Sequence, residues 1–248
     1  MDGRAMTIKR GMKCGYWSHL VVFCSILSSW SITGGQLIFH SRHTGLQFSS
    51  HSKETTVFGD KFYKRLRKLM PWQQTVFALA LSERMYPNYC LYAESTGRGD
   101  TRLIRSALDT MWQYLTEKSM QVDLSAILEQ IEADMPEPQK EECYGAWPAL
   151  DACVALATAY NSVVFRLGDE AYDVSQTSMG TVVGFIEMQQ GQELSTDALY
   201  AEPLIEDEMA FQVALLEEVS QPRDASVIWK IKEMAAQDGI SNLGISLE

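Results

Sequence analysis

YGAWPALDACVALATAY, residues 144–160, is a strongly apolar segment with the length and composition of a buried helix. Pro148 suits the first turn of a helix, because the N–H that proline lacks would have no helical partner there. From Ala149 to Tyr160, only Asp151 and Thr158 are polar. A helix that is apolar on nearly every side must be covered on nearly every side. The sequence therefore predicts an all-α, compact domain of about seven to ten helices around a buried central helix at 148–167.

Six further stretches have the apolar spacing that is typical of helices. They cover 61–69, 72–85, 101–116, 125–133, 169–190 and 225–236. We expect the second to end at Tyr86, since the residue before a proline, here Pro87, avoids the α conformation. Asp100 is expected to cap the helix that follows it, and Gly168 to close the central helix. We find no convincing pair of strands.

The C-terminal part of the chain is predicted to hold a further helix, opened by Pro203, and a docked tail. Three acids fall in the first turn of that helix, where the helix dipole favours negative charge. Its core stripe is expected to be Ile205, Met209, Val213 and Leu216. The apolar tail 239–245 is too short and too rich in glycine for a helix, so we expect an extended strap.

Gly180 and Gly184 lie four residues apart on one face of the predicted helix 169–190. Each glycine disfavours the helix by about 1 kcal/mol relative to alanine. One explanation is close backbone packing against the alanine-rich central helix. The other is that the two glycines leave room for a ligand at the same place.

The balance of basic and acidic residues changes near residue 60. Residues 1–60 carry six basic and three acidic side chains, whereas the remainder carries 15 basic and 29 acidic ones, a net charge of −14. A body that is so acidic repels phosphate backbones and anionic lipid surfaces. We therefore expect no nucleic acid and no membrane among the partners of the body.

Histidine and cysteine limit the chemistry that the body can perform. All four histidines precede residue 52, so the body cannot use a Ser-His-Asp or Cys-His arrangement or a zinc site that needs histidine. No glycine-rich nucleotide-binding loop is found. We therefore predict no cofactor, no catalytic residue and no metal ligand, although a site made of carboxylates alone stays open. The five cysteines are odd in number and form no C-x-x-C pair, which favours a reduced, cytoplasmic protein.

Residues 1–56 differ from the rest of the chain in being rich in serine, glycine and histidine. We interpret 1–56 as a leader that is disordered or not native, as a wrongly chosen start codon would produce, and 57–248 as the domain. Two alternatives stay open. Residues 14–41 carry no charged side chain and follow basic residues, which also fits a secretion signal or a membrane anchor.

Polar side chains next to apolar runs mark the candidate site. Asp151 and Thr158 are seven residues apart, so they share one face of the central helix. A buried carboxylate needs partners, and we expect the carboxylate of Asp151 to meet Arg84 or the tyrosines near it. The candidate polar network or ligand site comprises Glu83, Arg84, Tyr86, Asn88, Tyr89, Asp151, Thr158, Ser178 and Glu187. Such a cluster either fixes the register of the helices or lines a binding pocket.

Five short stretches together resemble one protein family. They are SERMYPNY at 82–89, TGRGD at 96–100, YGAWPALDAC at 144–153, SQTS at 175–178 and SNLGI at 241–245. They are similar to the bacterial YjaG-like family, a domain of unknown function, over roughly residues 60–247. The resemblance implies an all-α, bacterial, cytoplasmic protein, and a link to histidine-kinase signalling has been suggested for the family. It assigns no catalytic residue.

Two classes of function follow from these observations. The first is a non-enzymatic binding or regulatory module that contacts another protein, for which the acidic surface suits a basic partner. The alternative is an enzyme, such as a hydrolase or transferase, or a protein that binds a small ligand or a metal. It would use the carboxylate, arginine and tyrosine groups at 83–89 and 151. The sequence leaves the identity of the partner and the oligomeric state open.

Overall fold

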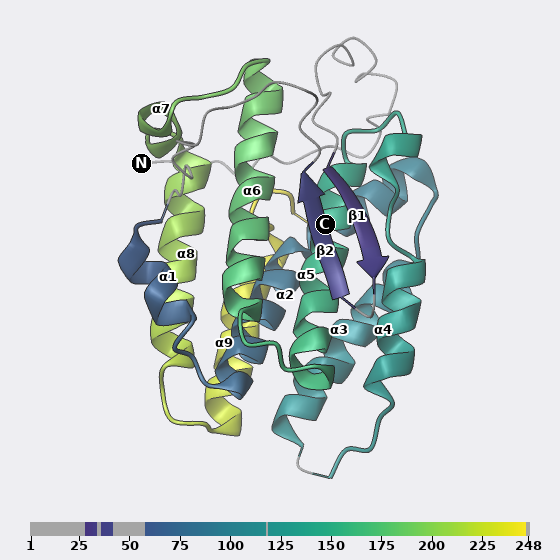
Figure 1. Cartoon of the computed structure of the whole chain (residues 1–248), viewed down its shortest axis with the longest axis vertical. Coiled ribbons are helices and arrows are strands. Elements are labelled where there is room, and N and C mark those ends of the chain that lie inside the picture. Colours follow the sequence, from purple (N-terminus) through teal and green to yellow (C-terminus); the bar gives the residue numbers. More distant parts are fainter. Residues whose placement is uncertain (1–27, 34–35, 42–57, 118, 247–248) are drawn as a thin grey trace.

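The computed structural model describes residues 28–33, 36–41, 58–117 and 119–246, and its body is all-α, as predicted (Figure 1). The α-helices are α1 Asp60–Leu66, α2 Pro71–Thr96, α3 Thr101–Thr116, α4 Leu124–Ala133, α5 Ala146–Val164, α6 Glu170–Gln190, α7 Thr196–Tyr200, α8 Pro203–Val219 and α9 Ala225–Ala236. Short 3-10 helices cover Pro138–Lys140 and Gln237–Gly239. In this part of the chain, no helix is long and apolar enough to cross a membrane.

Two helices, α2 and α5, share the centre of the bundle. The buried side chains of α5 include nearly every residue from Ala146 to Tyr160, which confirms the predicted central helix. The side chains of α2 are equally inaccessible from Val76 to Leu81. The two helices run antiparallel, since Gln74 near the start of α2 binds the carbonyl of Gly168 just beyond α5. The fold therefore has a central pair of helices instead of a single central helix.

The prediction that the second helix ends at Tyr86 was wrong, because α2 continues through Pro87 to Thr96. An interior proline removes one helical hydrogen bond and costs roughly 3 kcal/mol. The side chains around it, Met85, Asn88 and Tyr89, are all buried. Their burial offsets that cost, so tertiary packing overrides the local preference of the chain.

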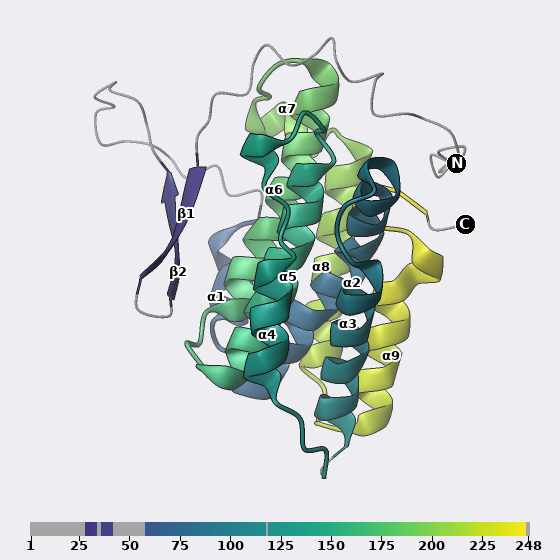
Figure 2. The same ribbon diagram turned by 90° about the vertical axis from the view of Figure 1, so that its right-hand side faces the viewer.

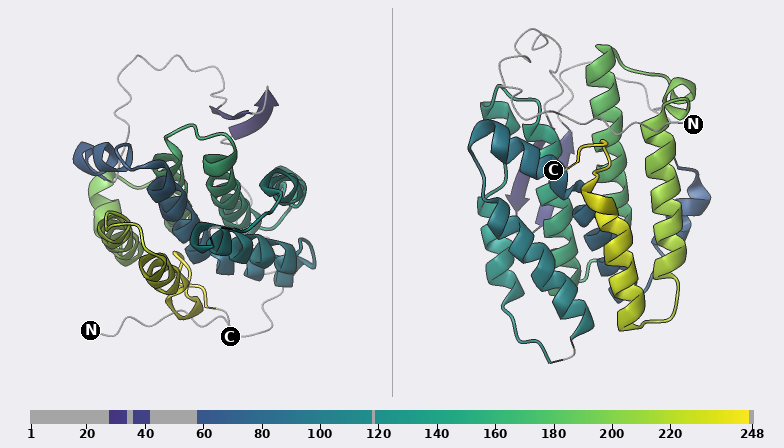
Figure 3. Two further views of the ribbon diagram at one scale, coloured as in Figure 1. Left: turned by 90° about the horizontal axis from the view of Figure 1, so that it is seen from below. Right: turned by 180° about the vertical axis from the view of Figure 1, so that it is seen from behind.

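The other helices surround this pair (Figures 1 and 3). Helix α6 packs against both central helices, and α4 covers α5. Helices α3, α8 and α9 cover α2. The side chain of Asp100 accepts bonds from the backbone N–H groups of Arg102 and Leu103, which confirms it as the cap of α3. The helices around the pair therefore supply the partners of several of its polar side chains, such as Glu83 on α2, which meets α3, and Asp151 on α5, which meets α6.

The central helix α5 ends earlier than predicted, at Val164 instead of about residue 167. Arg166 adopts the left-handed conformation, with φ of 57°, and its N–H donates to the carbonyl of Asn161 at 3.2 Å. Gly168, with φ of 103°, comes two residues later. The chain thus leaves the helix through a left-handed arginine, and residues 165–169 are all exposed.

The C-terminal tail docks on the body, but it folds back in a tight turn instead of forming the predicted extended strap. The Ser241 N–H donates to the Ile245 carbonyl at 2.8 Å, and Ile240 and Ser246 form a β-bridge. Leu243 and Asn242 are both buried. The tail therefore belongs to the folded body.

An antiparallel hairpin precedes the helical body, which differs from the expectation of no strand pair (Figure 2). It joins β1 Ser28–Thr33 to β2 Gln36–Ser41, with Ser28 opposite Ser41 and Thr33 opposite Gln36. Gly34-Gly35 lies between the strands in the sequence, and a glycine pair at this place is a known hairpin signal. Most of 1–56 lies outside the described residues, so its interpretation as a non-native leader, a secretion signal or an anchor stays a prediction.

Candidate functional site

The residues predicted to form one network at 83–89 point in different directions from α2. Successive residues on an α-helix are rotated by about 100°, so neighbours in sequence face different helices. Glu83 faces α3, whereas Arg84 faces α8. The expected single cluster is therefore a set of separate groups.

The first group joins α2, α3 and α9 through Glu83. Arg105 Nη1 and Nη2 donate to the two carboxylate oxygens of Glu83 at 2.6 and 2.8 Å. Trp112 Nε1 donates to Glu83 Oε2 at 2.9 Å. Arg105 also binds Asp109, and Lys232 Nζ lies 2.8 Å from Asp109 Oδ1. Burial acts to raise the pKa of Asp109, but the bonds from Lys232 and Arg105 outweigh it and lower the pKa.

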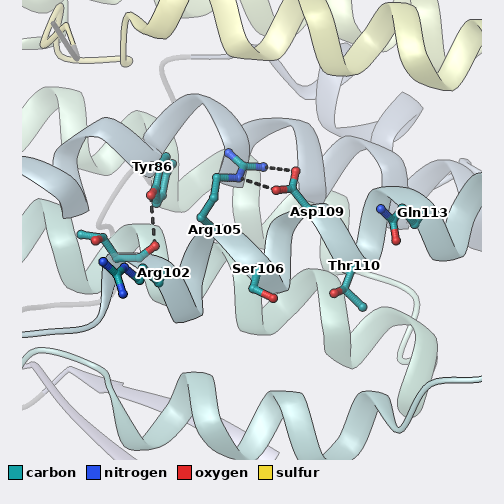
Figure 4. Close-up of a pocket in the computed structure, with 8 residues that line it drawn as sticks. Tyr86, Arg102, Arg105, Ser106, Asp109, Thr110 and Gln113 are labelled. Atoms are coloured by element: carbon teal, nitrogen blue, oxygen red, sulfur yellow. Dashed lines mark hydrogen bonds and ion pairs between the residues drawn. The ribbon is translucent and has the colours of Figure 1, made fainter.

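An open hollow of about 520 Å³ follows α3 beside this group (Figure 4). It is lined by Tyr86, Thr101, Arg102, Arg105, Ser106, Asp109, Thr110 and Gln113. Tyr86 donates its hydroxyl to the Thr101 carbonyl at 3.1 Å, and the Arg105 guanidinium lies 5.1 Å from the Tyr86 ring centroid. Burial raises the pKa of Tyr86, which keeps its hydroxyl protonated. Hydroxyl, amide and guanidinium groups therefore face the same polar hollow.

The second group is a buried ion pair between Arg84 and Glu208. Arg84 Nε lies 3.0 Å from Glu208 Oε2, and the two side chains are 5% and 0% exposed. Arg84 also stacks over the Phe211 ring, at 4.3 Å from its centroid, and binds the side chain of Gln237. Glu208 accepts further bonds from Ser178 Oγ at 2.6 Å and Gln212 Nε2 at 2.8 Å. The group thus connects α2, α6 and α8.

This arrangement corrects the predicted face of α8. The prediction placed Val213 in the core, but its side chain is exposed. The buried face instead includes Glu208 and Gln212 beside Ile205 and Leu216. Ile205 and Leu216 are buried and Met209 packs against the core, as predicted, so Val213 is the misplaced member of the predicted stripe.

Asn88 links α2 to the C-terminal tail. Its Nδ2 donates to Asn242 Oδ1 at 2.9 Å, and Asn242 Nδ2 donates to Ser178 Oγ at 3.1 Å. Through Ser178, these amides join the buried ion pair. Asn88 and Ser178, both predicted site residues, therefore serve one polar core that also includes the tail.

Tyr89 forms a third group at the start of α3. Its hydroxyl donates to Asp134 and accepts from the backbone N–H of Asp100 at 2.9 Å. A Cβ atom at Gly99 would lie 2.4 Å from this hydroxyl oxygen, and Gly99 has φ of +77°. The position therefore requires glycine for both space and conformation.

Asp151 does not pair with Arg84 or the tyrosines, so the predicted pairing was wrong. Its half-buried carboxylate accepts a bond from Thr181 Oγ1 at 2.7 Å. Thr158 does not extend this contact, because its hydroxyl donates to the Val154 carbonyl in its own helix. Burial raises the pKa of Asp151 to about 7, although the Thr181 bond acts in the opposite direction. A carboxylate with a hydroxyl partner is thus the polar contact between α5 and α6.

The glycines of α6 do not serve close packing, which was one of the two explanations considered. A Cβ at Gly180 would meet no atom within 4 Å, and one at Gly184 would meet the Tyr144 hydroxyl at 3.7 Å. Glu187 accepts the Leu194 N–H at 3.0 Å and so stabilises the turn after α6. Across the residues that the structure describes, no three His, Cys, Asp or Glu side chains are grouped so that they could hold a metal ion.

Comparison with known proteins gives the family. The model of the family described as "Protein of unknown function (DUF416)" matches residues 61–246. The chain belongs to the DUF416 family. Its relatives include "Uncharacterized protein YjaG" of Escherichia coli strain K12, 38% identical over 188 residues that cover 73% of this chain and 94% of the relative. An uncharacterized protein of Haemophilus influenzae is 32% identical over 187 residues, 74% of this chain and 95% of the relative.

A solved member of the DUF416 family shares the fold. The crystal structure of a DUF416 family protein from Shewanella baltica OS155 matches with a TM-score of 0.71 and 32% sequence identity. The match covers 75% of this chain and 98% of that protein. The resemblance read from residues 82–89 and 144–153 is therefore confirmed, and the chain is a DUF416 member with bacterial relatives.

Proposed function

We propose that this DUF416 protein is a non-enzymatic binding module that acts through contacts with another protein. The observation that carries the proposal is the position of its exposed apolar side chains. Met70, Phe165 and Leu167 are 53%, 51% and 62% exposed and lie on neighbouring turns at one end of the bundle. Grouped exposed apolar residues commonly mark protein interaction sites.

The bonding of the candidate site supports the same proposal. The carboxylates of Glu83 on α2 and Glu208 on α8 each accept three side-chain bonds, all but the one from Gln212 coming from other helices. Such saturated groups fix the register of helices. A regulatory role linked to signalling, which the family resemblance suggests, would need a rigid module with an exposed contact surface.

We also propose that the protein is cytoplasmic. Cys90 and Cys153 form no disulfide, which suits a reducing compartment. The net charge of −14 beyond residue 60 supports a partner that is neither a nucleic acid nor a membrane.

The test is to isolate the full chain from its bacterial host at native expression level, after brief chemical crosslinking. We expect a complex of fixed stoichiometry in light scattering. Phe165→Ser with Leu167→Ser should abolish the complex, whereas Val213→Ser, which alters an exposed apolar residue on α8, should not. A chain that stays free of other proteins in these experiments would contradict the proposal.

A small-ligand protein, or an enzyme that acts on such a ligand, is a second candidate, favoured by the polar hollow along α3. Its volume of about 520 Å³ lies within the range of ligand sites. A ligand that binds the folded state raises the melting temperature. A thermal-shift screen with metabolites and Mg²⁺ tests this candidate, and Ser106→Leu, which fills the hollow, should remove any shift. An unshifted melting temperature across the screen counts against it.

A further inference from the structure

Two turns lie near each other at the lower end of the bundle in Figure 1. One is the α1–α2 turn at 67–70, and the other is the α5–α6 turn at 165–169. Gln74 Nε2 donates to Gly168 O at 2.6 Å and to Leu69 O at 3.4 Å, so a single amide joins the two turns. Arg67 adds an ion pair with Asp169 at 3.6 Å. We name the exposed residues of these turns the turn surface: Arg67, Lys68, Met70, Phe165, Arg166, Leu167, Gly168 and Asp169, with three cations and one carboxylate.

The turn surface is basic, although the molecule as a whole is acidic. Five of the 15 basic residues beyond residue 60 fall within 61–68. Between residues 141 and 222, Arg166 is the sole lysine or arginine of the sequence. Among the residues that the structure describes, neither Lys68 nor Arg166 forms an ion pair, and both are exposed. The fold therefore places the isolated cation of a long acidic stretch on the turn next to the one that carries Arg67 and Lys68.

The fold itself does not require an arginine at position 166. The end of α5 is stabilised by backbone bonds from residues 165 and 166 to the Asn161 carbonyl. The left-handed backbone conformation at position 166 would suit glycine better, since this conformation costs other residues roughly 1–2 kcal/mol. Arg166 occupies this position with Phe165 and Leu167 exposed on either side. A side chain that the local backbone disfavours at an exposed position is a reason to look for a binding role.

We propose that the turn surface binds an acidic segment of another protein, whose apolar side chains contact Met70, Phe165 and Leu167. This inference rests on the proposed function and names the surface and the charge of the partner. The sequence alone suggested a basic partner for the acidic body, whereas this end of the molecule has the opposite charge. Lys68 and Arg166 would pair with carboxylates that flank the apolar contacts.

A short acidic segment fits the charges better than the other possible occupants. An anionic membrane would also face the acidic body, whose net charge of −14 opposes that approach. A second copy that placed its acidic side on this basic end would form a head-to-tail contact, which leads to open chains unless the rotation closes a ring. A segment that covers the turn surface alone meets neither difficulty.

The experiment places a photo-crosslinking amino acid, benzoyl-phenylalanine, at Leu167 of the full chain in its bacterial host, with Val213 as the matched exposed control. We expect an adduct at 167 whose crosslinked peptide, identified by mass spectrometry, comes from another protein and is rich in Asp and Glu. The double charge reversal K68E/R166E should reduce the adduct at least about tenfold. K140E/K230E, an equal change in charge at exposed positions elsewhere, should leave it unchanged. Circular dichroism establishes that each variant is folded.

The other outcomes separate this inference from the proposed function. An adduct at 213 but not at 167 overturns the turn surface and leaves the binding module standing. An adduct at 167 with a lipid, a second copy of the chain or a peptide without acidic residues likewise overturns the inference about the turn surface and leaves the binding module standing. If neither position gives an adduct and the chain purifies without a partner, both the surface and the binding module are wrong.

Discussion

The two central helices stabilise their polar side chains in different ways. On α2, Glu83 and Arg84 are neighbours in sequence, and each finds an oppositely charged partner on another helix. On α5, Asp151 meets a threonine hydroxyl on α6. The charged groups of α2 are therefore held by ion pairs, whereas the carboxylate between α5 and α6 is held by a hydroxyl group. This difference predicts opposite responses to mutation and to pH on the two sides.

The largest effect is expected at the buried pair of Arg84 and Glu208. Glu208→Ala leaves the arginine charge buried without its counter-ion, which costs about 3–5 kcal/mol of the free energy of unfolding. Urea denaturation measures this loss. The double variant R84M/E208L, which removes both charges, should recover most of it. A loss below about 1 kcal/mol for Glu208→Ala would show that the pair does not contribute as its burial indicates.

A smaller loss is expected at Glu83, because its partner Arg105 is 29% exposed and also binds Asp109. Glu83→Gln should cost about 1–3 kcal/mol, the range for lost hydrogen bonds to a charged group. Urea denaturation at low and high salt gives the measurement. Added salt should reduce this loss more than that of Glu208→Ala, since exposed charges are screened more strongly. Equal salt dependence at the two sites would contradict the comparison.

Mutation of Asp151 is expected to change the free energy of unfolding in the opposite direction. Burial raises the pKa of this carboxyl from 3.8 to about 7. The folded state holds this proton more tightly than the unfolded chain, so the free energy of unfolding falls as the pH rises from about 4 to about 7. Asp151→Asn removes the charge and should stabilise the protein at pH 8 by about 1–2 kcal/mol, after allowance for solvent screening of a half-buried group. Thermal unfolding at several pH values measures the effect.

Asp109→Asn provides the matched control for Asp151→Asn. The pKa of Asp109 is lowered by its cations, so its contribution to stability is present at neutral pH and is lost as the pH falls through the lowered pKa. This variant should therefore lose stability at pH 7, with the difference from the natural chain shrinking in acid. The same pH dependence for both variants would show that the two carboxylates do not differ as described.

The smallest effect concerns glycine on the same two sides. Gly180→Ala on α6 should stabilise the protein by up to about 1 kcal/mol, because its Cβ would meet no atom within 4 Å and alanine favours the helix. Gly99→Ala on the α2 side should destabilise it, since the new Cβ would contact the Tyr89 hydroxyl. Melting temperatures measure both. If the Gly180→Ala protein is stable but no longer binds a small ligand that the natural chain binds, the result would instead support the explanation that this glycine leaves room for a ligand.

The sequence predicted elements whose signals are local. The apolar run at 149–160 and the cap at Asp100 gave helices at the right places. Pro87 misled the prediction because buried neighbours outweighed its local preference. The Gly34-Gly35 pair is a local hairpin signal, although the sequence analysis predicted no pair of strands.

The partners in the candidate site could not be predicted, because each depends on contacts between distant parts of the chain. Glu208 is 124 residues from Arg84. Glu208 lies three residues after Ile205 on the buried face of α8. From the sequence, however, an acidic residue near the start of a helix is equally compatible with an exposed position. Arg105 and Asp109 are four residues apart on α3, which is a visible signal for a pair. Nothing local showed that Glu83 would complete it.

The contacts of the C-terminal tail have a consequence for the order of folding during synthesis. Gln237 binds Arg84, and Asn242 binds Asn88 and Ser178, although all nine helices from α1 to α9 in the described chain precede these residues. A nascent chain can therefore assemble its helices while Asn88 of α2 still lacks its side-chain partner and Arg84 lacks one of its partners. The last contacts complete the interior, so a polypeptide interrupted before residue 237 remains recognisably unfinished to the proteases and chaperones that survey new proteins.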